Sequence, residues 1–127
     1  MKPMRTPLSR VLHFGSARSG TEHFWRQRLT GAANVPLVIG LIVIVVTTVG
    51  QPYETAVTFL GSPWVAAVLV LFFLSVAIHM RIGMQAVVED YIHAEGLKVV
   101  LLAASTFFSF GVAAVAILAI LKLTFGV

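Results

Sequence analysis

Cysteine is absent from this chain of 127 residues, and charged side chains are scarce. Without cysteine the chain has no disulfide framework, no thiolate metal site and no cysteine-ligated iron–sulfur cluster of its own. Aspartate and glutamate together number only 5, and charged residues make up 11% of the chain against 58% hydrophobic residues. This composition excludes a disordered chain and disfavours a water-soluble domain. We therefore interpret the chain as an integral membrane protein.

Three apolar stretches are long enough to cross a bilayer as helices, which takes about 20 mostly apolar residues each. They are predicted at about 29–50, 64–89 and 97–123. The predicted fold is all-α, with a basic N-terminal segment, 1–27, followed by a three-helix transmembrane anchor, 28–127. Few residues remain outside the bilayer, so any chemistry takes place in the membrane, at its surface or on a partner.

Six of the 9 lysine and arginine residues lie before the first stretch. The loop at 50–63, which breaker residues mark as a short external loop, carries only Glu54. Because lysine and arginine accumulate on the cytoplasmic side, we expect a cytoplasmic N-terminus and an external C-terminus, and no nucleic-acid partner. Residues 1–27 are interpreted as an amphipathic surface helix or a docking arm for a cytosolic partner. The basic residues that precede the first apolar stretch are Lys2, Arg5, Arg10, Arg18, Arg26 and Arg28.

The first span contains a proline. The apolar run at 35–49 reaches only about 22 Å as a helix, which is too short alone. The helix should therefore extend back through Thr30 and Arg28, with a kink at Pro36 where the bond to the Ala32 carbonyl is missing. Arg28 would then lie at the cytoplasmic end, where it can reach phosphates or an acidic group.

The second span contains an ionisable residue, His79, and ends at Asp90-Tyr91. Over 11 residues a helix makes three turns plus about 20°, so His79 and Asp90 share one face, about 16 Å apart. With Asp90 at the cytoplasmic interface, His79 falls near the bilayer midplane. The small residues Ser75 and Gly83 lie one turn to either side, which predicts a shallow groove suited to a flat ring system such as a porphyrin.

His79 has two interpretations. A charged group at membrane depth costs roughly 2.5 kcal/mol or more, so such a residue is expected to be paired, to face protein or to bind something. It either hydrogen-bonds a neighbouring helix or serves as an axial ligand of haem iron. The other histidines, His13, His23 and His93, lie outside the bilayer, so a partner chain would supply the second ligand of a six-coordinate iron.

Asp90 and Tyr91 also have two interpretations. They are an ordinary interfacial pair, or the Tyr91 hydroxyl donates to a carbonyl of a lipid-soluble substrate while Asp90 orients it. Arg81 points about 200° away from His79 and is expected to pair with an acidic or polar group on another helix. The third span offers small residues for close helix packing, namely Ser105, Ser109, Ala113 and Ala116.

The segment from His79 to Tyr91 resembles the small hydrophobic membrane anchor of succinate dehydrogenase, the respiratory complex II. The pattern of that family is a histidine, a glycine four residues on, a bulky apolar residue, five further residues and Asp-Tyr. His79, Gly83, Met84, Asp90 and Tyr91 all fit it. The resemblance covers about 19–127, because 20–24 and 28–30 look like the family's segment entering the first span.

The resemblance implies roles for four residues. His79 would be an axial ligand of haem b, shared with a histidine of the second membrane anchor of the complex. Arg28 would lie near a haem propionate. Tyr91 would hydrogen-bond ubiquinone, with Asp90 beside it, at a site shared with the second anchor and the iron–sulfur protein.

The resemblance further implies a subunit of succinate:ubiquinone oxidoreductase, of the tricarboxylic acid cycle and aerobic respiration, without turnover alone. FAD and iron–sulfur clusters would be carried only by the flavoprotein and iron–sulfur subunits. The location would be the bacterial inner membrane, with the C-terminus periplasmic. Two alternatives remain open: the anchor of another b-type cytochrome, such as a fumarate reductase, and a non-enzymatic helical accessory protein of the membrane.

Overall fold

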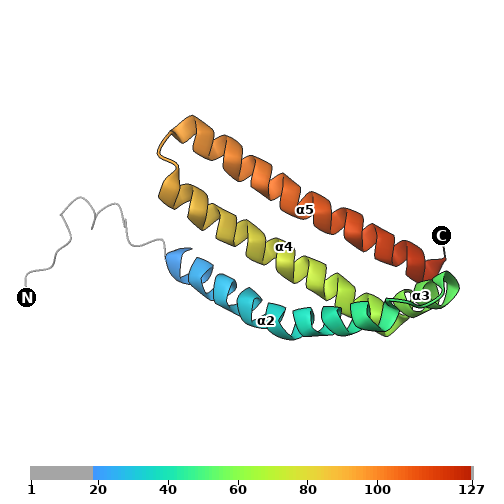
Figure 1. The fold of residues 1–127 in the computed structure, drawn as a ribbon. Helices are drawn as coiled ribbons and strands as arrows, with labels where there is room; N and C mark the ends of the chain where they lie inside the picture. Colours follow the sequence, from blue (N-terminus) through green and yellow to red (C-terminus); the bar gives the residue numbers. More distant parts are fainter. Residues whose placement is uncertain (1–18, 127) are drawn as a thin grey trace, which may run out of the picture.

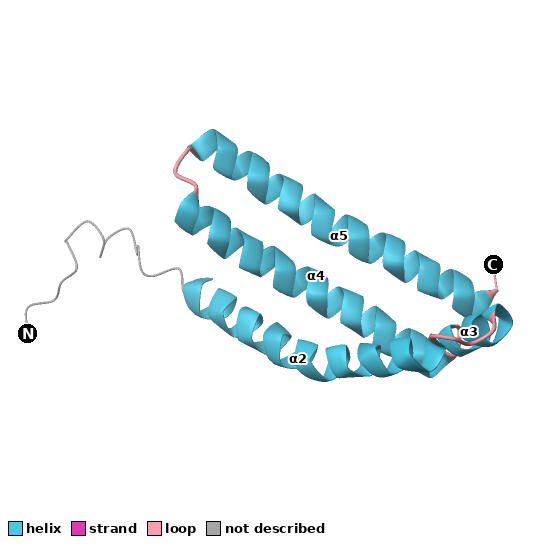
Figure 2. Ribbon diagram, viewed as in Figure 1, coloured by secondary structure: helices cyan, strands magenta, loops and turns pink. Residues whose placement is uncertain are grey.

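The computed structural model describes residues 19–126, and these residues form helices and short connections only (Figures 1 and 2). The helices are α2 (Ser19–Thr48), α3 (Tyr53–Leu60), α4 (Pro63–Tyr91) and α5 (Glu95–Phe125). Helices α2, α4 and α5 are long and apolar enough to cross a membrane, whereas α3 is short. The predicted all-α fold with three spans is confirmed.

The three long helices form a single open layer rather than a closed bundle (Figure 1). Helix α4 lies in the middle and packs on both α2 and α5, whose backbones do not come close to each other within 19–126. The start of α2, the end of α4 and the start of α5 lie at one end of the layer. Helix α3 and the C-terminus lie at the other.

Helix α2 begins at Ser19, before the predicted start of the span at about residue 29. The predicted boundary between 27 and 28 therefore falls inside a helix, which an ion pair between Arg26 and Glu22 one turn apart supports. The part of the N-terminal segment before Ser19 lies outside the described residues. Pro36 lies within α2, and the ribbon bends in the middle part of this helix, in agreement with the predicted kink (Figure 1).

The loop predicted at 50–63 contains a helix, α3, that the sequence reasoning missed. It begins after Pro52 and ends at Gly61. Its apolar side chains Phe59 and Leu60 pack against a buried cluster contributed by all three long helices. Burial against distant residues therefore stabilises this short helix. The cluster consists of Ile44, Ala66, Leu69 and Ile120.

Helix α5 packs on α4 through small residues, as predicted. Ser109 is 1% exposed and Ala113 is also buried, whereas Ser105 and Ala116 are half-buried. The Ser109 hydroxyl donates to the Ser105 carbonyl at 2.7 Å, so its polar group is satisfied within its own helix. Small side chains allow the two backbones to approach closely.

Candidate functional site

The imidazole of His79 is half-buried and faces α2. Its Nδ1 lies 3.1 Å from Thr30 Oγ1. Thr30 Oγ1 also donates to the Arg26 carbonyl at 2.7 Å, one turn earlier in α2. An ideal Cβ on Gly31 would lie 3.3 Å from His79 Cε1, so the missing side chain at Gly31 lets the ring approach the α2 backbone.

Polar contacts continue along α2 and α4 on both sides of His79. Towards α3, Ser75 Oγ donates to Asn34 Oδ1 at 2.6 Å. Towards the start of α2, a Cβ on Gly83 would lie 3.5 Å from Gln27 Nε2. The contacts recur at successive turns of two antiparallel helices, and we name this set the polar seam. It pairs Gln27, Thr30 and Asn34 of α2 with Gly83, His79 and Ser75 of α4.

The polar seam corrects one expectation. The groove predicted beside Ser75 and Gly83 is covered by α2, because Asn34 bonds Ser75 and Gln27 fills the space beside Gly83. A flat ring therefore has no access to His79 along that line. The ring nitrogen that remains is Nε2, which makes no hydrogen bond to any residue of 19–126. His79 thus leaves Nε2 without a hydrogen bond among these residues, on the side of the ring away from Thr30.

Arg28 lines a cavity of about 600 Å³ between the start of α2 and the end of α4. Its guanidinium carbon lies 4.5 Å from the centroid of the Phe24 ring, a cation–π contact. Gln27 also lines this cavity, and its Oε1 is buried without a hydrogen-bond partner in the described part of the chain. The cavity is therefore partly polar, and it adjoins the Gln27–Gly83 contact of the polar seam. His23, Gln85 and Glu89 contribute further polar groups.

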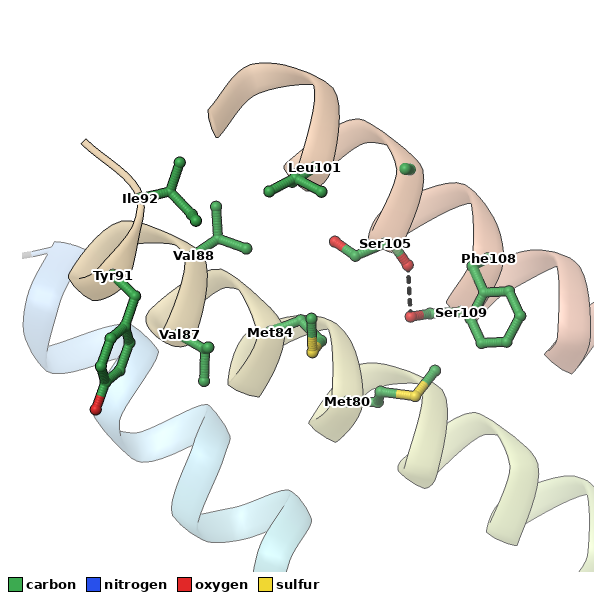
Figure 3. Close-up of a pocket in the computed structure, with 11 residues that line it drawn as sticks. Met80, Met84, Val87, Val88, Tyr91, Ile92, Leu101, Ser105, Phe108 and Ser109 are labelled. Atoms are coloured by element: carbon green, nitrogen blue, oxygen red, sulfur yellow. Dashed lines mark hydrogen bonds between the residues drawn. The ribbon is translucent and has the colours of Figure 1, made fainter. Parts of the chain in front are cut away.

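Tyr91 lines a different, almost wholly apolar groove of about 540 Å³ between α4 and α5 (Figure 3). Met80, Met84 and Val87 follow it along α4, and the Tyr91 ring is directed away from α5 at the end of this groove. Tyr91 is 76% exposed. Asp90 is exposed beside it, and neither side chain has a hydrogen bond or ion pair that the described residues provide.

The structure does not bring Tyr91 together with His79. Tyr91 follows His79 by 12 positions, which advance about 18 Å along α4 and turn about 120°, so the two side chains leave α4 in different directions. His79 faces α2, whereas Tyr91 lies beside the α4–α5 groove. The two residues that the sequence singles out therefore lie in separate surroundings on one helix.

The expected partner of Arg81 is not found within the described chain. Its Nε is buried and makes no hydrogen bond to residues 19–126, and none of the ion pairs there includes it. That same range has no cluster of three or more histidine, cysteine, aspartate or glutamate side chains able to hold a metal ion. At His79, the described residues provide a single imidazole as a metal ligand.

Sequence reasoning missed Gln27, Thr30 and Asn34 as site residues. Their spacing of three and then four residues places them on one face of α2, a signal that can be read from the sequence. The signal is weak because Gln27 precedes the span predicted from about residue 29, and because the apolar residues of that span outnumber Thr30 and Asn34. Polar residues recurring at helical period in a span are typical of a protein-facing side.

These observations define a multi-pass helical membrane protein, built as an open layer with a polar seam around a histidine of its central helix. The family model described as succinate dehydrogenase/fumarate reductase transmembrane subunit matches residues 2–120. The chain belongs to this family, and the resemblance drawn from the segment 79–91 is confirmed.

Three curated relatives are similar to most of the chain. The succinate dehydrogenase membrane anchor subunit of Reclinomonas americana is 32% identical over 94 residues, 72% of this chain and 78% of that protein. The hydrophobic membrane anchor subunit of Paracoccus denitrificans is 26% identical over 121 residues, 95% and 93% of the two chains. Its counterpart in Rickettsia bellii (strain RML369-C) is 28% identical over 105 residues, 83% and 84%. No solved structure matches the chain significantly.

Proposed function

We propose that this chain anchors succinate:ubiquinone oxidoreductase in the membrane, contributes His79 as one axial ligand of haem b and contributes Tyr91 to the ubiquinone-reduction site. The observation that carries the haem assignment is the hydrogen bonding of the two ring nitrogens of His79. Its Nδ1 is engaged by Thr30, and its Nε2 is free at the half-buried face of the central span. The contact with α2 uses Nδ1 alone, so Nε2 stays available to ligate iron.

The donor set fits a shared haem better than a complete site within this chain. One imidazole supplies one axial position, so the other comes from the second membrane anchor of the complex. Arg28 lines the partly polar cavity that adjoins the polar seam, where its guanidinium suits a carboxylate such as a haem propionate. Haem bound at His79 supplies a group that takes up and releases one electron at a time.

Tyr91 is suited to hold a quinone at the membrane surface. Its exposed hydroxyl donates a hydrogen bond to a quinone carbonyl, and the adjacent Asp90 carboxylate orients neighbouring donors. An apolar groove between α4 and α5, which Tyr91 lines, lies next to this hydroxyl-bearing side chain. Substrate reduction at this end of α4 requires the iron–sulfur protein to dock here, since this chain has no cysteine for a cluster.

The partners we assign are a second membrane anchor, the iron–sulfur protein and the flavoprotein, with FAD and the iron–sulfur clusters confined to the last two. Six basic residues near the N-terminus support a cytoplasmic N-terminus and a periplasmic C-terminus in a bacterial inner membrane. The complex would oxidise succinate on its cytoplasmic side and reduce ubiquinone in the membrane. This chain alone would have no turnover.

Purification in a mild detergent tests this function. We expect a flavoprotein and an iron–sulfur protein to accompany the chain, with b-type absorbance that succinate reduces. A colourless homo-oligomer would overturn the proposal.

Replacement of one histidine tests the ligand assignment. His79→Ala should remove or strongly alter the b-type spectrum, since it deletes the imidazole, whereas His93→Ala, in the exposed connection after α4, should leave it intact. An unchanged spectrum in His79→Ala would show that the haem ligand lies elsewhere.

A further inference from the structure

We infer that Thr30 is a positioning residue for His79: its hydroxyl oxygen accepts a hydrogen bond from Nδ1–H and thereby holds the imidazole in the tautomer whose Nε2 is free to ligate iron. This inference rests on the proposed role of His79 as a haem ligand. It gives α2 a role at the haem although α2 provides no proposed iron ligand, and it gives Thr30 a role that its residue type alone does not indicate.

The direction of the hydrogen bond follows from the single proton of a hydroxyl group. Thr30 Oγ1 lies 2.7 Å from the Arg26 carbonyl oxygen and 3.2 Å from the Gln27 carbonyl oxygen. Two oxygens at 2.7 Å attract each other only with a proton between them, so the Thr30 proton points at the Arg26 carbonyl. Its lone pairs then face His79 Nδ1 at 3.1 Å.

The tautomer of His79 follows in turn. A lone pair of Thr30 facing an unprotonated Nδ1 would place two acceptors in contact, which is unfavourable in an apolar surrounding. Nδ1 therefore carries the proton and donates it to Thr30. In a neutral imidazole the other nitrogen, Nε2, is then the acceptor, which is the form that binds a metal ion.

The α2 backbone limits the movement of the ring as well. His79 Cε1 lies where an ideal Cβ on Gly31 would be only 3.3 Å away, so the edge of the imidazole rests on the helix next to Thr30. Metal-bound histidines commonly donate their other N–H to an acceptor that fixes the ring orientation and raises ligand basicity. A neutral threonine hydroxyl on a neighbouring span is the acceptor that this chain provides.

Substitution of Thr30 in the purified complex tests the inference. The measurements are the midpoint potential and the EPR spectrum of the haem, not the turnover of the enzyme. Thr30→Val keeps the shape and removes the acceptor, so the ligand becomes less electron-donating. We expect the haem midpoint potential to rise, with a roughly tenfold shift in the ferrous-to-ferric ratio at fixed potential, about 59 mV for a one-electron couple. The low-temperature EPR spectrum of the ferric haem should change with it.

Two variants serve as controls. Thr30→Ser restores a hydroxyl and should return the potential and the EPR spectrum close to the wild-type values. Thr47→Val removes a comparable bond, from Thr47 Oγ1 to the Val43 carbonyl, at an exposed position of the same helix, and should change neither measurement. If Thr30→Val does not assemble, Thr30→Ala replaces it in the same comparison with Thr30→Ser.

A wild-type potential and EPR spectrum in Thr30→Val or Thr30→Ala would overturn the inference while leaving the haem ligation by His79 standing. A shift that Thr30→Ser does not reverse would also overturn it, since packing rather than the hydroxyl would then be the cause. A wild-type complex without b-type absorbance would overturn both the proposed ligation by His79 and the inference about Thr30. The absorbance of the wild-type complex is measured before any variant is made.

Discussion

At the scale of single residues, the environment of His79 depends on small groups of α2. Gly31 leaves room for the ring edge, and Thr30 meets its nitrogen. Neither residue is ionisable, and neither suggests a site by its chemistry. The histidine that the sequence singles out is therefore held by residues that the sequence does not single out.

Gly31→Ala tests how closely the ring fits against α2. The added methyl group would meet His79 Cε1 at 3.3 Å, so the imidazole must shift by a few tenths of an ångström. We expect a changed haem absorption or EPR spectrum with the complex still assembled. Gly40→Ala is the matched control, because its methyl group would meet Val68 Cγ1 at the same 3.3 Å, away from His79. Equal spectral changes in the two variants would contradict this prediction.

Tyr91→Phe tests the quinone site by removing one hydroxyl. If the hydroxyl donates to the quinone, its loss costs about 0.5–1.5 kcal/mol, up to roughly a tenfold lower rate of quinone reduction at low quinone concentration. The haem spectrum should be retained, since Tyr91 and His79 lie in different sites on α4. Tyr53→Phe is the control, because Tyr53 is 76% exposed like Tyr91 but lies in α3 at the other end. Equal quinone kinetics in wild type and Tyr91→Phe would refute the assignment.

At the scale of the elements, the helix α3 and the turn that follows it close one end of the layer. An ideal Cβ on Gly61 would lie 2.7 Å from the backbone carbonyl oxygen of Leu123, near the end of α5. Only a residue without a side chain permits this approach of the α3–α4 turn to α5. The short helix is thus tied to the last span by backbone packing.

Gly61→Ala should loosen that end of the molecule. Because a backbone carbonyl cannot swing aside as a side chain can, we expect a loss of stability of about 1–3 kcal/mol, measured by thermal unfolding of the purified complex. Gly111→Ala, with no heavy atom within 4 Å of its ideal Cβ, should be neutral or slightly stabilising in mid-helix. A Gly61→Ala complex as stable as Gly111→Ala would show that the approach is not tight.

At the scale of the whole molecule, the open layer exposes most of its apolar surface. In the most apolar 18-residue segment of each long helix, the share of buried residues is only 6% in α2, 22% in α4 and 17% in α5. Lipid chains cover such surface readily, but they offer no hydrogen-bond acceptor to Arg81 Nε and no second iron ligand for the haem proposed at His79. The layer is therefore suited to pack against a further membrane anchor.

The orientation of the layer is testable because the chain has no cysteine. A single cysteine at Glu54 in α3 or at Ala94 between α4 and α5, both exposed, would be the chain's only thiol. For a cytoplasmic N-terminus, a membrane-impermeant maleimide should label Glu54→Cys in spheroplasts and Ala94→Cys only after lysis. The reverse pattern would invert the predicted topology.

The sequence alone determined the class of fold and the residues of interest on α4. Three apolar runs demand helices, because a spanning segment must satisfy its own backbone hydrogen bonds, and this needs no knowledge of packing. The segment from His79 to Tyr91 likewise identified the family. The helix α3 was missed because its stability comes from contacts with residues distant in the sequence.

Only the tertiary structure decided what His79 contacts. Helical periodicity places Ser75 and Gly83 beside His79, but it does not say which helix covers that face. The arrangement of α2 against α4 filled the expected groove and placed Thr30 against Nδ1. Register between two spans is set by packing over their whole length, so the hydrogen-bond partner of a buried histidine is a property of the fold rather than of its local sequence.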